Sequence, residues 1–128
     1  MNYKRELLDL LKLANRCRRL QTSLPKINSF KAIKETEAVE NGLDRMLRRI
    51  ETALSVDAEQ AGPWELELRQ LFKLANECRI IQNGYFGGRA SITSSMVKDV
   101  EGRLDELLLR IAIALELQDR AAEIALLE

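Results

Sequence analysis

The sequence predicts an all-α fold, and more specifically a four-helix bundle built from two tandemly duplicated helical hairpins. Three observations lead to this prediction: the composition favours helices, apolar residues recur at helical spacing, and the chain matches itself after a shift. The 128 residues are 46% hydrophobic and 31% charged, with two prolines and few aromatic residues. This balance is typical of a globular helical domain that buries a core without disulfides or metal.

The two halves of the chain match when the sequence is shifted by 61 residues. Residues 10–21 (LLKLANRCRRLQ) and 71–82 (LFKLANECRIIQ) are identical at eight of twelve positions. Residues 39–54 (VENGLDRMLRRIETAL) and 100–115 (VEGRLDELLLRIAIAL) are identical at nine of sixteen. Two blocks in one register predict a duplicated helix–loop–helix unit. We therefore expect a single domain, 1–128, with unit one at 1–56, a linker at 57–62 and unit two at 63–128.

In the first hairpin, apolar residues recur every three or four positions in two segments, which predicts helices at 2–21 and 30–56. The stripe residues are Leu7, Leu10, Ala14 and Cys17 in the first segment and Val39, Leu43, Met46 and Ile50 in the second. Leu24-Pro25 is expected to separate the two helices, because the residue before a proline disfavours helical geometry.

The second hairpin repeats this pattern, which predicts helices at 63–82 and 92–126. Its stripes contain Leu68, Leu71, Ala75 and Cys78, followed by Val100, Leu104, Leu108 and Ile111. Pro63 suits the first turn of a helix, where its missing N–H has no partner in any case. The Asn83-Gly84 pair indicates the break between the two helices. No segment alternates apolar and polar residues, so no strand is predicted.

A single hairpin would leave its apolar stripe exposed. Two hairpins related by a pseudo-twofold axis can bury both stripes against each other, which is the arrangement of a four-helix bundle. An ancestral homodimer of one hairpin is a plausible origin for the repeat.

Three pairs of residues at equivalent repeat positions carry structural expectations. Cys17 and Cys78 are expected to be small core residues, with a redox or metal pair as the alternative. Each hairpin is also expected to contain one ion pair between its two helices, Lys12 with Glu40 in unit one and Lys73 with Glu101 in unit two. Each pair would contribute on the order of 1 kcal/mol or less.

The residue content argues against an enzyme. The chain has no histidine, which removes Ser-His-Asp triads, HExxH zinc sites and the Glu-x-x-His pattern of di-iron bundles. No phosphate-binding glycine loop is present, so we expect no cofactor, no metal and no small-molecule substrate. No apolar run approaches the roughly 20 residues of a membrane span. Charged residues soon after Met1 argue against a signal peptide, and we expect a cytoplasmic protein.

Arginines of unit one form the first candidate binding surface. Twenty basic and twenty acidic residues give no net charge, which argues against a dedicated nucleic-acid binder. Unit one nevertheless keeps an excess of basic residues. Its candidate contacts for a phosphate backbone are Arg16, Arg19, Arg45, Arg48 and Arg49. The alternative is a solvated basic face with cations near a helix C-terminus.

The segment 83–89 forms the second candidate, because it combines glycines with aromatic residues. Tyr85 and Phe86 are expected in a loop, with Arg89 beside them. The rings either cover the end of the bundle or form an exposed recognition tip that stacks on a base or enters a pocket of a partner.

The outer face of the fourth helix forms the third candidate. Arg48, Glu51 and Thr52 of unit one correspond to Leu109, Ala112 and Ile113 of unit two, so this helix gains a second apolar stripe. The proposed interface residues are Leu109, Ile113, Leu117, Ala121 and Ile124. Exposed apolar stripes usually mark protein contacts. The alternative is that a longer C-terminal segment folds back over its own bundle.

These features predict a non-enzymatic interaction or adaptor protein that forms homo-oligomers or docks a protein partner through the second face of helix four. The alternative is an accessory protein that binds RNA or DNA through the basic surface of unit one. The segments KLAN at 12–15 and LDRML at 43–47 resemble, in generic helical residues, small bundle proteins encoded beside retroelements or within ribosomal RNA insertions. This resemblance is an analogy to proteins that act with RNA and assigns no family.

Overall fold

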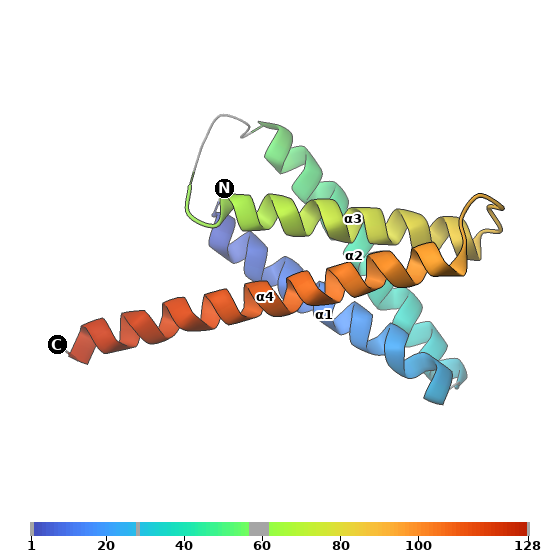
Figure 1. Cartoon of the computed structure of the whole chain (residues 1–128), viewed down its shortest axis with the longest axis horizontal. Helices are drawn as coiled ribbons and strands as arrows, with labels where there is room; N and C mark the ends of the chain where they lie inside the picture. The colour runs from blue at the N-terminus through green and yellow to red at the C-terminus, as the bar shows by residue number, and fades with distance from the viewer. Residues whose placement is uncertain (1, 28, 57–61, 128) are drawn as a thin grey trace.

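The computed structural model describes residues 2–27, 29–56 and 62–127, with side chains described within 2–26, 29–55 and 62–120. This part of the chain forms four helices, α1 (Tyr3–Ile27), α2 (Phe30–Val56), α3 (Glu65–Phe86) and α4 (Ser94–Leu127), and contains no strand. In Figure 1, α1 pairs with α2, α3 pairs with α4, and the two hairpins cross each other. The prediction of an all-α four-helix bundle is confirmed.

The core forms where the four apolar stripes meet. Each helix contributes leucines that are at most 2% exposed: Leu7 and Leu10, Leu43 and Leu47, Leu68 and Leu71, and Leu104 and Leu108. Burial of each such side chain contributes about 1.5–3 kcal/mol. Helices α1 and α3 contact each other. In addition, α1 contacts α4 and α3 contacts α2, whereas no contact joins α2 to α4 within the described chain. The centre of the bundle therefore lies between α1 and α3.

Side-chain caps begin three of the helices. Asn2 Oδ1 accepts from the Arg5 N–H at 3.1 Å, Ser29 Oγ from the Ala32 N–H at 3.1 Å, and Thr93 Oγ1 from the Met96 N–H at 3.2 Å. Each bond satisfies an N–H that has no partner within its helix.

Helix α3 begins differently. Trp64, just before it, has a left-handed backbone with φ of 69°, and Glu65 Oε2 accepts a bond from the Gly62 N–H at 3.3 Å. Pro63 therefore lies in the turn before α3 rather than in its first turn.

The predicted end of α1 was six residues too early, because the helix continues through Pro25 to Ile27. A proline in the last turn removes one backbone bond but does not force the chain out of the helix. Thr22 and Ser23 donate their hydroxyls to the carbonyls of Arg18 and Arg19, both at 2.8 Å, so they bond to the helix rather than interrupt it.

The predicted break at Asn83-Gly84 was also wrong, because α3 continues to Phe86. Gly84 is buried, and a Cβ atom there would overlap the Ile92 side chain. The glycine thus allows the following segment to pack closely on the helix. Gly88, with φ of 85°, has the left-handed geometry that ends helices, and the Arg89 N–H bonds to the Gly84 carbonyl at 2.9 Å.

Helix α4 is longer than the bundle needs. Figure 1 shows its C-terminal part extending past the other three helices. Leu115 is its last buried residue within the described side chains, and Lys4 and Asp119 are 3.5 Å apart beyond it. No helix in the described chain is both long and apolar enough to cross a membrane.

Candidate functional site

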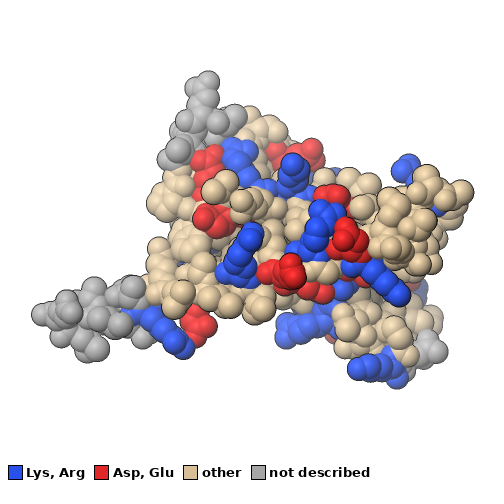
Figure 2. Space-filling model, viewed as in Figure 1, with Lys and Arg blue, Asp and Glu red and all other residues tan. Residues whose placement is uncertain are grey.

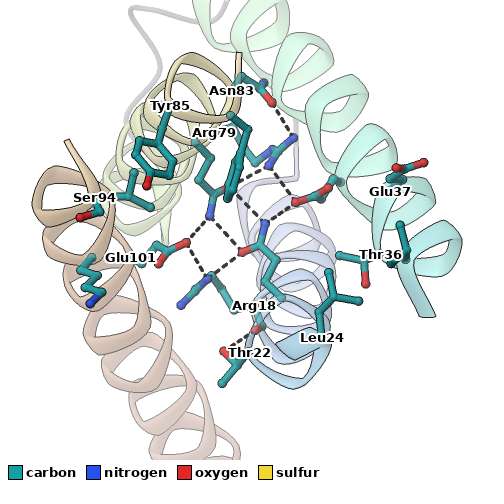
Figure 3. Close-up of a pocket in the computed structure, with 17 residues that line it drawn as sticks. Arg18, Thr22, Leu24, Thr36, Glu37, Arg79, Asn83, Tyr85, Ser94 and Glu101 are labelled. Atoms are coloured by element: carbon teal, nitrogen blue, oxygen red, sulfur yellow. Dashed lines mark hydrogen bonds and ion pairs between the residues drawn. The ribbon is translucent and has the colours of Figure 1, made fainter. Parts of the chain in front are cut away.

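A network of eight polar side chains joins the two hairpins inside the bundle. Each helix contributes two residues: Arg18 and Gln21 from α1, Glu40 and Asp44 from α2, Arg79 and Gln82 from α3, and Glu101 and Asp105 from α4. Each residue of one hairpin is 61 positions from its counterpart in the other, so the network consists of two equivalent halves. Figure 3 draws six of the eight residues, all except Asp44 and Asp105, and shows them converging from the four helices.

Bidentate ion pairs connect the hairpins. Arg79 donates from Nε and Nη2 to the two carboxylate oxygens of Asp44 at 2.8 and 3.2 Å. Arg18 makes the same pair with Asp105, at the same two distances. Paired charge-assisted bonds of this kind are among the stronger polar contacts in proteins and fix the orientation of both partners. They therefore hold the two hairpins together in their crossed arrangement.

A reciprocal amide pair lies at the centre of the network. Gln21 and Gln82 donate to each other at 3.1 and 3.0 Å, and each also donates at 2.7 Å to the glutamate of its own hairpin, Glu40 or Glu101. Each accepts a further bond at 2.7 Å from the nearby arginine. Both amides thus use two donor hydrogens and two acceptor positions, which is their full capacity.

The charges of the network do not cancel. Two arginines face four carboxylates, which leaves a net charge of −2. Arg79 is 8% exposed and Arg18 14% exposed. Burial acts to lower the pKa of the Arg79 guanidinium, but the hydrogen bonds and charge of Asp44, together with Glu40, outweigh it and raise that pKa above its ordinary value. The same balance, with Asp105 and Glu101, raises the pKa of Arg18.

The two cysteines lie close to this network and are 1% exposed. Burial raises the pKa of the Cys17 thiol to about 11 and that of Cys78 to about 12, against a partial lowering by the arginines. A protonated, inaccessible thiol is neither a nucleophile nor a metal ligand. The prediction of two small core residues is therefore confirmed. Among the described residues, no group of cysteine, aspartate and glutamate side chains could hold a metal ion.

A pocket of about 710 Å³ opens above the network, at the end of the bundle that carries the two hairpin turns. Six of the network residues form its floor: Arg18, Gln21, Glu40, Arg79, Gln82 and Glu101. Its apolar walls are Leu24, Ile33, Tyr85, Phe86 and Val97. Its polar walls are Thr22, Thr36, Glu37, Asn83, Ser94 and Lys98. All four helices line this volume, which falls in the usual range for small-molecule sites.

Tyr85 and Phe86 belong to the last turn of α3 rather than to a loop, which corrects the predicted recognition loop. Their rings meet edge to face, with centroids 5.3 Å apart. Both line the pocket, and Phe86 is 78% exposed. Arg89 follows in the connection to α4, with its side chain near Gly84. Of the three residues, two line the pocket mouth and Arg89 does not.

The predicted second stripe of α4 is exposed. Leu109, Ile113 and Leu117 are 63%, 49% and 60% exposed, and they follow one another at four-residue spacing on the face opposite the core. The side chains of Ala121 and Ile124, which complete the predicted stripe, lie outside the described residues. Within the described part of the chain, no segment folds back over these three residues.

Two of the five arginines predicted to bind phosphate are engaged in ion pairs with glutamates. Arg16 lies 3.5 Å from Glu35, and Arg49 forms a bidentate pair with Glu6 at 2.8 and 3.2 Å. The other three members, Arg19, Arg45 and Arg48, are exposed. On the face shown in Figure 2, Lys and Arg side chains lie among Asp and Glu over the middle of the molecule.

The predicted lysine–glutamate pairs were wrong, because Glu40 and Glu101 pair with Arg79 and Arg18 of the opposite hairpin, each at 3.2 Å. The sequence did carry a signal for the network, because each of the eight members is identical to the residue 61 positions away. The sequence analysis treated the glutamates as partners of Lys12 and Lys73 and gave no role to Gln21 and Asp44.

Comparison of the chain with protein-family models, with curated proteins and with solved structures finds no match in any of the three.

Proposed function

We propose that this protein is a non-enzymatic assembly module whose copies associate through the outer face of α4. The observation that carries the proposal is the exposure of Leu109, Ile113 and Leu117, between 49% and 63%, on a helix whose opposite face already fills the core. Exposed apolar side chains in a continuous row lose contact with water when a second row packs on them, at about 25 cal/mol per Å² of area buried.

The charges that flank the row favour a second copy of this chain in the antiparallel direction. Glu106 and Arg120 lie seven residues on either side of Ile113, close to the same face. An antiparallel copy brings each Glu106 level with Arg120 of the other copy and Ile113 level with itself. A parallel copy would instead oppose like charges, which is unfavourable. The row lies on the exposed side of α4, and the C-terminal part of this helix projects past the other three helices (Figure 1).

Size exclusion with light scattering tests the proposal. The wild-type chain is expected to give twice the monomer mass, and Leu109→Glu is expected to give a monomer. Leu66→Glu is the matched control, because Leu66 on α3 is 63% exposed, as Leu109 is. A monomeric wild type, or equal effects of the two substitutions, would contradict the proposed interface.

The antiparallel register has its own test. Ile113→Cys places a thiol beside its copy at the twofold axis, so mild oxidation is expected to give a disulfide-linked dimer. Leu66→Cys is expected to give none, and the buried native thiols add no background. Arg120→Glu should weaken the dimer, and addition of Glu106→Arg should restore it. Failure of the second charge change to rescue the first would reject this register.

The alternative, nucleic-acid binding through unit one, is checked in the same run. A high ratio of absorbance at 260 to 280 nm that falls with added salt would favour it, because phosphate contacts release counterions. In that case Arg19, Arg45 and Arg48, which are exposed, would be the first residues to replace.

A further inference from the structure

The pocket above the network has unused acceptors but almost no unused donors at its floor. Gln21 and Gln82 have no free position, and Arg79 directs its guanidinium to Asp44, Glu40, Gln82 and Asn83. Each floor glutamate, by contrast, receives its hydrogen bonds at Oε2. The side chains of Glu40 and Glu101 remain 23% and 22% exposed. No hydrogen bond or ion pair to their Oε1 atoms is seen among the described residues, so these atoms can accept from a donor that enters the pocket.

Charge and shape agree with this polarity. The six network residues at the floor carry no net charge, since two arginines face two glutamates, and Asp44 and Asp105 outside the lining bring the network to −2. At the rim, Glu37 and Lys98 carry opposite charges. Tyr85 and Phe86 line the same pocket as Glu40 and Glu101, and aromatic faces attract cations as well as apolar groups. Figure 3 shows Tyr85 and Leu24 on opposite sides of the ion-paired side chains.

We propose that this pocket is a binding site for a small organic cation, an ammonium group carried on an apolar or aromatic body. The ammonium donates to Oε1 of Glu40 or of Glu101, and the body packs on the apolar walls. An anion would meet a floor whose arginine and amide donors are almost all engaged, above a network with a net charge of −2. The site is independent of the outer face of α4.

The probe is 2-phenylethylammonium, compared with the neutral 2-phenylethanol and the anion phenylacetate. A ¹H–¹⁵N NMR titration follows the side-chain amides of Gln21 and Gln82. The cation is expected to saturate with a dissociation constant on the order of 1 mM and to shift both amides. The alcohol should bind at least about tenfold more weakly, since it lacks the charge. Equal binding of the alcohol, or tighter binding of phenylacetate, would overturn the proposal.

Two variants test the location without touching the network. Ser94 lines the pocket at the start of α4 and is exposed, so Ser94→Trp is expected to fill the mouth and abolish saturable binding. Ser95→Trp is the matched control, because Ser95 is exposed and does not line the pocket. If both variants bind the cation like the wild type, the site is elsewhere and the proposal fails.

Substitutions of the two charged residues at the rim are expected to change the affinity for the cation in opposite directions. Lys98→Gln removes a like charge and is expected to tighten binding of the cation about threefold, whereas Glu37→Gln should weaken it by a similar factor. Both residues are exposed, so neither change should disturb folding. Changes in the same direction, or no change in either variant, would exclude an electrostatic site for a cation.

Discussion

Gln82 is 2% exposed and its amide makes four hydrogen bonds, two of them to Gln21. A leucine of similar size would suit the burial of this position. The structure nevertheless requires an amide, because Arg79, Gln21 and Glu101 all direct polar atoms to it. The partners therefore decide the residue type at this position. Without the amide their buried polar atoms would lose their hydrogen bonds, and this cost exceeds the gain from burying an apolar side chain.

Gln82→Leu is therefore expected to destabilise the protein by about 2–3 kcal/mol, since it leaves buried polar partners without bonds. Gln21→Leu should cost a similar amount. The double variant should cost about 1 kcal/mol less than the sum of the two single variants. Each single variant already loses the bonds between the two amides, so the sum includes that loss twice. Urea unfolding followed by circular dichroism measures all three. Strict additivity would mean that the two amides are not coupled.

The buried thiols predict a loss of stability at alkaline pH. The folded-state pKa values of Cys17 and Cys78 are raised from 9.0 to about 11 and about 12. Above pH 9 the unfolded chain releases both protons while the folded protein retains them, so the contribution to stability is full below pH 9 and is lost as pH rises towards 11 and 12. At pH 10 each thiol should account for about 1 kcal/mol of the loss.

The Cys17→Ala/Cys78→Ala variant isolates this effect from other groups that titrate in the same range. Its unfolding free energy at pH 8 should be lower than that of the wild type, because side-chain atoms are removed from the core. Its further loss between pH 8 and pH 10 should be smaller than that of the wild type. An equal loss in the two proteins would show that the thiols do not contribute to the alkaline decline.

At the scale of the helices, the sequence predicted α2 and α4 to within two residues at each end, because their apolar stripes run unbroken up to capping residues. It ended α1 and α3 too early, because Pro25 and Gly84 were both interpreted as helix breakers. The reason for Gly84 is a tertiary contact with Ile92, which lies eight residues further along the chain. Local propensity could not reveal a glycine retained for close packing.

The glycines of the helices predict opposite effects of one substitution. A Cβ at Gly102 on α4 would meet no atom within 4 Å, so Gly102→Ala is expected to stabilise the protein by about 0.5–1 kcal/mol. Gly84→Ala should destabilise it by about 1–3 kcal/mol, because the new methyl group would overlap Ile92 in a buried site. Thermal unfolding of the two variants compares them directly. Stabilisation by Gly84→Ala would show that Ile92 relaxes without cost.

At the scale of the whole molecule, the repeat predicted that two hairpins would pack on each other, but not which polar groups would join them. Pairing Glu40 with Lys12 assumed that ion pairs form within a hairpin. The structure instead connects Arg79 to Glu40 and Asp44 of the opposite hairpin. Sequence periodicity identifies the face of a helix, whereas the crossing angle of two hairpins decides which residues on that face meet. The pocket also results from the way the two hairpins cross, so no sequence motif predicted it.

The two halves of the network have equal geometry but unequal burial, and this difference predicts unequal energetics. Asp44 is 28% exposed and Asp105 49%, although each accepts the same two bonds, at 2.8 and 3.2 Å, from its arginine. Solvent screens the pair of Asp105 more strongly, and Arg79 is more deeply buried than Arg18.

Asp44→Asn is therefore expected to cost about 2–3 kcal/mol and Asp105→Asn about 1 kcal/mol. Double-mutant cycles with Arg79→Met and Arg18→Met separate each pair energy from the cost of leaving one charge alone. High salt should reduce the coupling between Arg18 and Asp105 more than that between Arg79 and Asp44, since exposed charges are screened first. Equal coupling energies with equal salt dependence would mean that geometry, rather than burial, sets the strength with which the two hairpins are joined.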